Sequence, residues 1–183
     1  MTPSSKDLFE ALPHVLAAPK DGAAISHLCL RPERNARRFV PEITLTRAGG
    51  IPGERWATQP WLRLDNGDPH PGIQVCLIPQ RVLDLVWHPE LDTLHPGDTF
   101  AADIDMTETN MPEGQLLSVG SAVLRVSGVF NEGCVKWKAR YGPEAYDWVR
   151  DPRHRAYRLR GVLCSVEQDG VIREGDILRK VAD

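Results

Sequence analysis

The 183-residue sequence predicts a mainly β protein, a compact barrel with a few short flanking helices. About seven short runs show the apolar patterns of strands, and Gly, Pro, Asn and Asp turn signals separate them. Helical spacing occurs in only two or three segments. A composition of 42% hydrophobic and 26% charged residues is typical of one globular domain with a substantial core.

The N-terminal end is expected to form an arm, residues 1–30, with a short helix and the first strand. Residues 31–183 are expected to form the barrel domain. Residues 4–12 show helical spacing that Pro13 should end or kink, and residues 27–30 have the pattern of a strand. The first residues lack the order of a signal peptide, and no run approaches the ~18 apolar residues of a membrane span, so we expect a cytoplasmic protein.

The middle of the chain alternates strands with one helix. Residues 43–46 alternate cleanly, and residues 73–78 form a second strand, with alternate side chains on one face. Pro79 opens a helix that continues to about Trp87. Residues 100–104 form a further strand. The apolar stripe expected on the helix consists of Val82, Leu83 and Val86.

The C-terminal part contains the clearest strand, residues 119–130, which leads into a loop. A short helix is expected at residues 143–149, with Pro143 at its first position. Another strand is expected at residues 157–166, with two arginines on one face. Asp169-Gly170 is a hairpin signal before the last strand, residues 177–181.

Four cysteines are far apart in the sequence and form no Cys-x-x-Cys pair, which argues against a structural zinc site and a disulfide scaffold. Cys29, Cys76 and Cys164 lie in apolar runs, as small buried side chains do. Cys134 differs, because it follows a glycine and precedes three basic residues. Cations and helix N-termini stabilise thiolates, and a thiolate serves as a nucleophile, a sulfur carrier or a soft-metal ligand.

The charge of the protein is unevenly distributed. The net charge is −3, which argues against general nucleic-acid binding, yet residues 131–160 hold eight Lys and Arg against four acids. A local basic region on an acidic protein suits a small anionic ligand, although a solvated basic face has the same composition. A second basic cluster, residues 31–38, could face an anion or form an exposed loop.

Several other site classes lack support in the sequence. Asp103 and Asp105 share a strand face, but the residues after them do not complete a calcium loop. No His-Glu-x-x-His, P-loop or Gly-x-Ser-x-Gly pattern occurs. A metal site made by the protein alone, a nucleotide site and a hydrolase site are therefore not expected.

The segment around Cys134 resembles a known family. The pattern Gly-Cys-x-Lys-aromatic-x-x-Arg-aromatic-Gly, at residues 133–142, follows Gly-x-Ala-x-Leu-x-Val at 120–126. Shorter pieces lie at residues 97–100, 110–114, 160–162 and 169–176. In this order and spacing the pieces are similar to the MOSC domain, the C-terminal domain of molybdenum-cofactor sulfurases, over roughly residues 40–180.

The resemblance implies a β-barrel with flanking helices and a role for Cys134 as a ligand of molybdenum in the molybdenum-pterin cofactor (molybdopterin). In related reductases such a site reduces N-hydroxylated compounds, and the electron donor would be a separate redox partner. The family pattern Gly-x-x-Gly-Asp-Arg has Glu54 in place of Asp here. The residues that the resemblance and the basic segment point to as cofactor-binding are Arg55, Asn110, Lys136, Arg140, Arg158 and Arg160.

Two alternatives remain open at the level of sequence. The family was also proposed to carry sulfur as a persulfide on this cysteine, in which case a cysteine desulfurase would be the partner. The chain has no room for a pyridoxal-phosphate domain of its own. The other alternative is a non-catalytic barrel that binds a small anion, with Cys134 incidental. Substrate and oligomeric state, including a homodimer, do not follow from the sequence.

Overall fold

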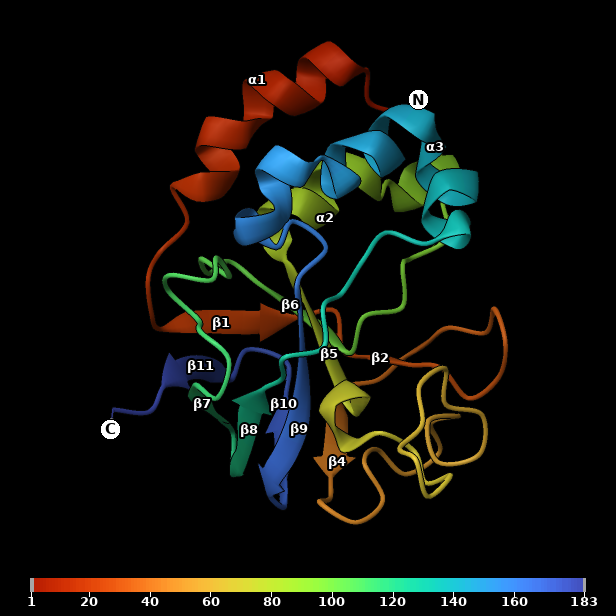
Figure 1. The fold of residues 1–183 in the computed structure, drawn as a ribbon, viewed down its shortest axis with the longest axis vertical. Coiled ribbons are helices and arrows are strands. Elements are labelled where there is room, and N and C mark those ends of the chain that lie inside the picture. The colour runs from red at the N-terminus through yellow and green to blue at the C-terminus, as the bar shows by residue number, and fades with distance from the viewer. Residues whose placement is uncertain (1, 183) are drawn as a thin grey trace.

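The computed structural model describes residues 2–182 and contains a closed barrel of seven strands (Figure 1). Neighbours pair antiparallel except for one parallel pair, β5 with β6. The barrel with a few short flanking helices that the sequence predicts is confirmed. Around the barrel the order is β1 (Ala23–Ser26), β11 (Ile177–Lys180), β7 (Leu116–Val119), β8 (Ala122–Val126), β9 (Val162–Gln168), β5 (Val75–Pro79) and β6 (Phe100–Ala102).

Four further strands form two small sheets beside the barrel. β2 (Cys29–Leu30) pairs with β3 (Arg38–Phe39), and β4 (Glu42–Leu45) pairs with β10 (Gly170–Arg173). The prediction of a hairpin at Asp169-Gly170 is wrong. Strand β10 follows β9 in the sequence but pairs with β4 instead of β9. A side chain at Gly170 would come within 2.4 Å of the Ser121 backbone, so this crossing requires glycine.

Three α-helices lie together over one end of the barrel, namely α1 (Ser5–Leu16), α2 (Gln80–Val86) and α3 (Val135–Arg150) (Figure 1). The short 3-10 helices are η1 (Pro71–Ile73), η2 (Pro89–Leu91) and η3 (Pro152–Tyr157). Among residues 2–182, none of the helices combines the length and apolar character that a membrane crossing requires.

Helix α1 begins with a capping box, in which Ser4 and Asp7 exchange side-chain and backbone hydrogen bonds. Pro13, which was expected to end or kink the helix, does not end it, because the helix continues to Leu16. Burial of Val15 beyond the proline holds this last turn against the neighbouring helices. Residues 23–26, assigned above to the N-terminal arm, supply barrel strand β1.

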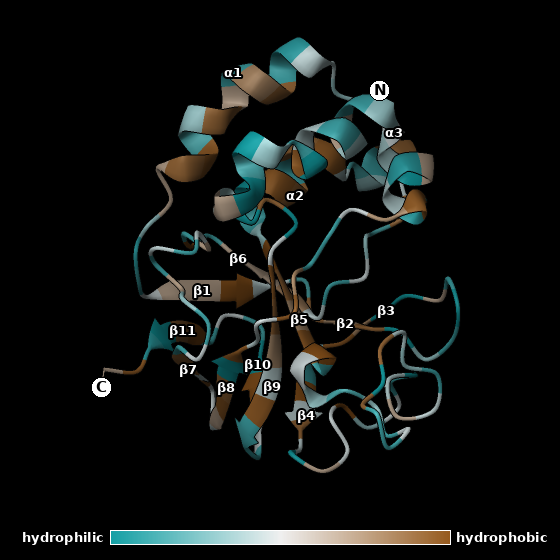
Figure 2. Cartoon of the chain, in the orientation of Figure 1, coloured by the Kyte–Doolittle hydropathy of each residue, from teal (hydrophilic) through white to brown (hydrophobic). Residues whose placement is uncertain are grey.

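Two apolar cores meet at strand β5, as the apolar colouring of strands and inner helix faces in Figure 2 illustrates. Val75 and Leu77 point into the barrel core. Ile78 belongs to the core under the helices, where it joins the predicted stripe of α2. Cys76 lies in a third, small cluster beside Trp56. The junction between barrel and helices is therefore built on alternate side chains of one strand.

The elements around Cys134 differ from those expected. Residues 119–130 are not one strand, because Gly120 turns the chain between β7 and β8, and β8 ends at Val126. Helix α3 begins at Val135, eight residues earlier than predicted. Gly142, with φ of 89°, kinks this helix immediately before Pro143. Because proline is common at the first position of a helix, the sequence suggested that a helix begins at Pro143.

The two arginines assigned to one strand face lie before that strand. Residues 152–157 form η3, and Arg158 has a left-handed backbone with φ of 49°. Strand β9 begins only at Val162. Gly161 fixes the connection, because a side chain there would come within 1.8 Å of the Leu77 carbonyl oxygen.

Candidate functional site

Cys134 is the exposed cysteine among four whose other members are buried. It is the N-cap residue of α3, and its carbonyl oxygen accepts hydrogen bonds from the backbone N–H groups of Trp137 and Lys138. Gly133 lets the loop lie against the last turn of the same helix, since a side chain there would come within 2.7 Å of Val149. The thiol is thus presented at a helix N-terminus, where the macrodipole favours negative charge.

Cys134 opens onto a pocket of about 600 Å³, here called the cysteine pocket, between the barrel and α3. Two carboxylates line it, Glu54 and Glu132. Seven cationic side chains surround it, so the pocket is strongly electropositive and suited to an anion. These cations are Arg31, Arg37, Arg55, Lys136, Arg140, Arg150 and Arg160.

Arg160 at the floor of the pocket is held by a buried carboxylate. Its Nη1 lies 2.7 Å from Oδ1 of Asp98, whose side chain is 0% exposed. The guanidinium also lies over the Trp137 ring, 4.7 Å from its centroid. Burial would raise the pKa of Asp98, but the charge and hydrogen bond of Arg160 outweigh it and lower the pKa. The same pairing raises the pKa of Arg160 against its own burial.

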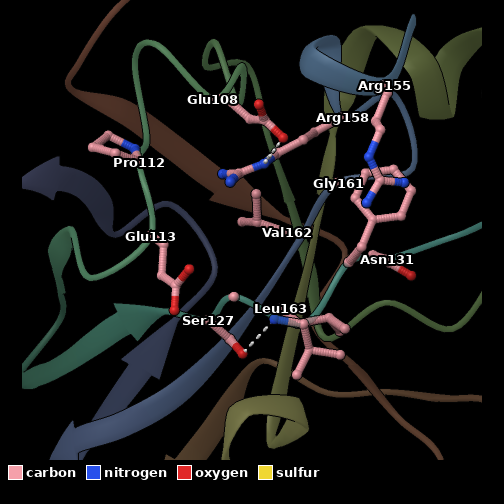
Figure 3. A pocket seen from close by; sticks show the side chains of 13 residues that line it. Glu108, Pro112, Glu113, Ser127, Asn131, Arg155, Arg158, Gly161, Val162 and Leu163 are labelled. Atoms are coloured by element: carbon pink, nitrogen blue, oxygen red, sulfur yellow. Dashed lines mark hydrogen bonds and ion pairs between the residues drawn. The ribbon is translucent and has the colours of Figure 1, made fainter. Parts of the chain in front are cut away.

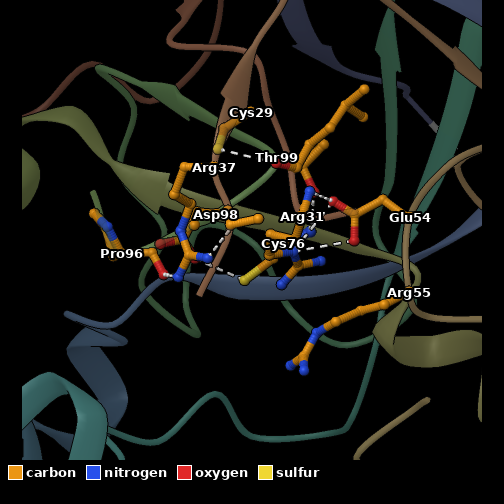
Figure 4. Close-up of polar contacts among 12 residues, drawn as sticks. Cys29, Arg31, Arg37, Glu54, Arg55, Cys76, Pro96, Asp98 and Thr99 are labelled. Atoms are coloured by element: carbon orange, nitrogen blue, oxygen red, sulfur yellow. Dashed lines mark hydrogen bonds and ion pairs between the residues drawn. The ribbon is translucent and has the colours of Figure 1, made fainter. Parts of the chain in front are cut away.

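The thiol of Cys76 shares the same carboxylate. Cys76 Sγ donates to Oδ1 of Asp98 at 2.7 Å (Figure 4). The Asn131 amide lies 3.5 Å from the sulfur. Burial and the charge of Asp98 raise the pKa of Cys76 well above its ordinary value. Cys76 is therefore a neutral hydrogen-bond donor at the pocket floor, which the sequence presented only as an apolar residue.

Arg31 is the second anchored arginine. Its Nε lies 3.1 Å from Oε2 of Glu54, and its backbone N–H donates to Oε1 at 2.5 Å (Figure 4). Burial lowers the pKa of Arg31, and the charge of Glu54 reverses this and raises it. Glu54, which departs from the family pattern, thus orients a guanidinium that lines the pocket.

Arg37 and Arg140 bond to carbonyl oxygens rather than carboxylates. Arg37 donates to the carbonyl oxygens of Ala36, His95 and Pro96 at 2.7–3.0 Å, and Arg140 donates to that of Pro96 at 3.2 Å. Burial, and then the nearby charge of Arg140, lower the pKa of Arg37. Carbonyl oxygens do not cancel the charge, so both side chains add to the positive potential of the pocket.

Arg55 and Lys136 form no side-chain hydrogen bond or ion pair with any other residue in the range 2–182. Burial, followed by the charges of Arg34, Arg55 and Arg140, lowers the pKa of Lys136. These cations repel one another, and a bound anion would relieve the repulsion. The cations Arg55 and Lys136 at the rim of the pocket therefore have no carboxylate partner in the described part of the chain, whereas Arg31 and Arg160 at the floor each have one.

The structure brings five of the seven predicted site residues to one pocket, namely Arg55, Cys134, Lys136, Arg140 and Arg160. It places the other two elsewhere. Asn110 bonds to the carbonyl oxygens of Lys20 and Asp105 and accepts from Lys180, which joins loops on another side of the barrel. Arg158 lines a different pocket.

The sequence left Arg31 and Arg37 undecided, within a basic cluster that could face an anion or lie in a loop. The structure puts both on the cysteine pocket. Asp103 and Asp105 form ion pairs with Arg81 and Lys20, respectively. Within residues 2–182, no three His, Cys, Asp or Glu side chains gather in a way that could hold a metal ion.

A family model described as the MOSC domain matches residues 69–179, which is more than half of the chain. The chain belongs to the MOSC domain family. The matched segment of this MOSC protein includes Asp98, Cys134, Lys136, Arg140 and Arg160. None of the curated proteins compared with the chain matches it.

Solved structures share the fold at low identity. The YuaD protein of Bacillus subtilis is 18% identical with a TM-score of 0.59, covering 86% of this chain and 94% of its own. YiiM of Escherichia coli is 17% identical with a TM-score of 0.58, covering 88% and 70%. YiiM of Geobacillus stearothermophilus is 15% identical with a TM-score of 0.56, covering 86% and 75%. At these identities the likeness concerns the fold.

Proposed function

We propose that this MOSC protein binds the molybdenum-pterin cofactor in the cysteine pocket through Cys134 and supports reduction of N-hydroxylated compounds. The observation that carries the proposal is the exposed thiol of Cys134 at the mouth of a pocket ringed by cations. A thiolate is a soft ligand of the kind that holds soft metal centres. The cations supply the charge that a phosphorylated cofactor requires.

The other residues of the pocket fit the same group. Trp56, Trp61, Phe130 and Trp137 line it and offer aromatic faces or edges to a planar ring. The volume of about 600 Å³ lies within the range of ~300–1,000 Å³ usual for small-molecule sites. The donor set therefore matches a ligand with a flat ring, a phosphate and a metal centre.

Residues at the rim and at the floor of the pocket would bind different parts of the cofactor. Cys134 would hold the metal, and Arg55, Lys136 and Arg140 would bind the phosphate through charge-assisted hydrogen bonds. Arg31 and Arg160 are preoriented by their carboxylate partners and would orient an oxygen-bearing group at the floor. When bound, the cofactor supplies two-electron oxygen-atom transfer, and the electrons would come from a separate donor.

The test compares wild type with Cys134→Ser, both produced in cells that make the cofactor. A serine oxygen is harder than sulfur and far less acidic, so it replaces a thiolate ligand poorly. Wild type should co-purify with molybdenum and pterin, and the variant should lose most of both. Reduction of N-hydroxylated purines or amidoximes with an artificial donor should require the wild-type cysteine.

Cys164→Ala is the matched control, because it removes a thiol that is buried away from the pocket. This variant should keep its cofactor content. Equal molybdenum in wild type and Cys134→Ser would contradict the assignment of Cys134 as the ligand.

The exposed position of Cys134 also suits a second function, a sulfur carrier. Its thiolate would attack the outer sulfur of a desulfurase persulfide, forming a persulfide on Cys134 and releasing the desulfurase thiolate. This alternative predicts no molybdenum in either protein. It predicts a sulfane-sulfur mass increment on Cys134 after incubation with a cysteine desulfurase, absent from Cys134→Ser. If wild type carries neither metal nor transferable sulfur, a non-catalytic anion-binding barrel is the better account.

A further inference from the structure

A second pocket of about 350 Å³ lies on the other side of the loop that leads to Cys134. Phe130, Asn131 and Leu163 line both pockets. Its charges differ from those of the cysteine pocket, because it is lined by two arginines and two glutamates, Arg155, Arg158, Glu108 and Glu113 (Figure 3). The second pocket is thus close to neutral overall and contains separated charges of both signs.

Arg158 is the less exposed of the two arginines in this pocket, and its carboxylate neighbour is distant. Its side chain is 12% exposed, and its nearest carboxylate oxygen, on Glu108, lies 4.0 Å from Nε. Nη1 donates to the Met111 carbonyl oxygen at 2.5 Å. Burial lowers the pKa of Arg158 despite the acids nearby, whereas the pKa of Arg160, two residues later, is raised by a contacting carboxylate. A partly buried guanidinium without a carboxylate in hydrogen-bond contact has donors left for a ligand anion.

Arg158 is held in this position by its backbone. It adopts the left-handed region, with φ of 49°, which is costly for a residue other than glycine. The fixed turn at Gly161 follows, so the side chains of Arg158 and Arg160 enter different pockets. Strained backbone of this kind is concentrated at ligand sites in proteins.

Glu113 supplies the opposite charge. Its carboxylate forms no hydrogen bond or ion pair with any other residue in the range 2–182. The absence of a side chain at Gly128 makes room for it, because a Cβ there would come within 2.5 Å of Glu113 Oε1. Figure 3 shows the Glu113 carboxylate and the Arg158 guanidinium entering the pocket from different segments of the chain.

We propose that the second pocket binds a small zwitterion of the α-amino-acid class. The carboxylate would bind Arg158, and the ammonium group would bind Glu113. Apolar side chains, Pro112, Val129 and Val162, would accommodate a short aliphatic group. A simple anion would meet repulsion from the glutamates and a simple cation from the arginines, so a ligand carrying both charges fits best.

The test is an NMR titration of the full chain with L-valine, followed at the backbone amides of Ser127, Gly128 and Val162. Isovalerate lacks only the ammonium group of valine, and L-valinamide lacks the carboxylate. L-valine, L-alanine or glycine should give saturable shifts at these amides, and isovalerate and L-valinamide should bind at least about tenfold more weakly. Isovalerate binding as tightly as the amino acids, or no saturable shift with any amino acid, would overturn the proposal.

Glu113→Gln is the main variant, because Glu113 is exposed and the substitution preserves shape. It should weaken L-valine about tenfold or more and bring isovalerate closer to valine in affinity. Arg158→Met should weaken both ligands. Arg173→Gln, an exposed arginine elsewhere, should leave binding unchanged. Cys134→Ser should also leave it unchanged, so failure here is distinguishable from failure of the cofactor proposal.

Discussion

The substitution Asp98→Asn tests the anchored arginine at the floor of the cysteine pocket. Oδ1 of Asp98 accepts hydrogen bonds from Arg160 and from the thiol of Cys76, each at 2.7 Å. Asparagine retains the shape of aspartate and an acceptor oxygen for the thiol. The variant removes the negative charge, and it leaves the buried guanidinium without its counterion.

The expected cost follows from the burial of the two partners. Removing one member of a buried ion pair costs about 3–5 kcal/mol, because the remaining charge stays desolvated. The side chain of Asp98 is 0% exposed and that of Arg160 is 13% exposed. The residual exposure and the Trp137 ring soften the loss, so we expect about 3 kcal/mol. Against a typical domain stability of about 5–15 kcal/mol, this loss is large.

Urea unfolding at neutral pH measures the effect. Asp98→Asn should lower the free energy of unfolding, and adding Arg160→Met should restore much of it by removing the unpaired charge. Glu42→Gln is the control, because Glu42 pairs with Arg173 where both side chains are more than half exposed, and loss of this pair should be close to undetectable. A loss below about 1 kcal/mol in Asp98→Asn, or no recovery in the double variant, would refute the reasoning.

The same pair has a predictable pH dependence. The folded-state pKa of Asp98 lies below the ordinary value of 3.8, because Arg160 outweighs the effect of burial. The stabilisation is therefore complete above the unfolded-state pKa and is lost as the pH falls through the lowered folded-state pKa. The stability difference between wild type and Asp98→Asn should stay constant from about pH 7 to pH 5 and shrink only below about pH 4.

Three further outcomes are expected. In timed alkylation with mass mapping, Cys134 should react before the three buried thiols, two of which have pKa values raised to about 11 and about 12 by burial. Arg55→Ala should weaken binding of phosphate to the cofactor-free protein about tenfold, measured by calorimetry, and unchanged affinity would exclude this residue from the site. Gly161→Ala should unfold at lower urea than Gly175→Ala: both have positive φ, but only residue 161 would meet the Leu77 carbonyl oxygen, at 1.8 Å.

The sequence was informative about the barrel because its strands carry their own local signal. The strands predicted at residues 73–78 and 177–181 correspond largely to barrel strands β5 and β11. The start of α3 was missed because Gly142-Pro143 looks locally like the beginning of a helix. Only the packing of Trp137 and Tyr141 into the core under the helices shows that the chain is helical before this point.

The site was only partly predictable, because the fold brings together residues that are far apart in the sequence. Cys134, Lys136 and Arg140 are neighbours in sequence, so their basic context was visible directly. Arg31 lies about a hundred residues earlier, and only the β2–β3 hairpin and the fold of the barrel bring it to the pocket. A period-two pattern placed Arg158 and Arg160 on one face, but the turn before β9 directs them into different pockets.

The division between anchored and free cations determines which ligand the cysteine pocket can favour. Arg31 and Arg160 already have carboxylate partners, so they offer hydrogen-bond donors but little unbalanced charge. Arg55 and Lys136 have no such partners within residues 2–182, and the lowered pKa of Lys136 reflects, after burial, this crowding of cations. A small neutral molecule would leave the repulsion at the rim unrelieved. An extended anion would place charge at the rim and oxygen atoms at the floor, and would be favoured on both counts.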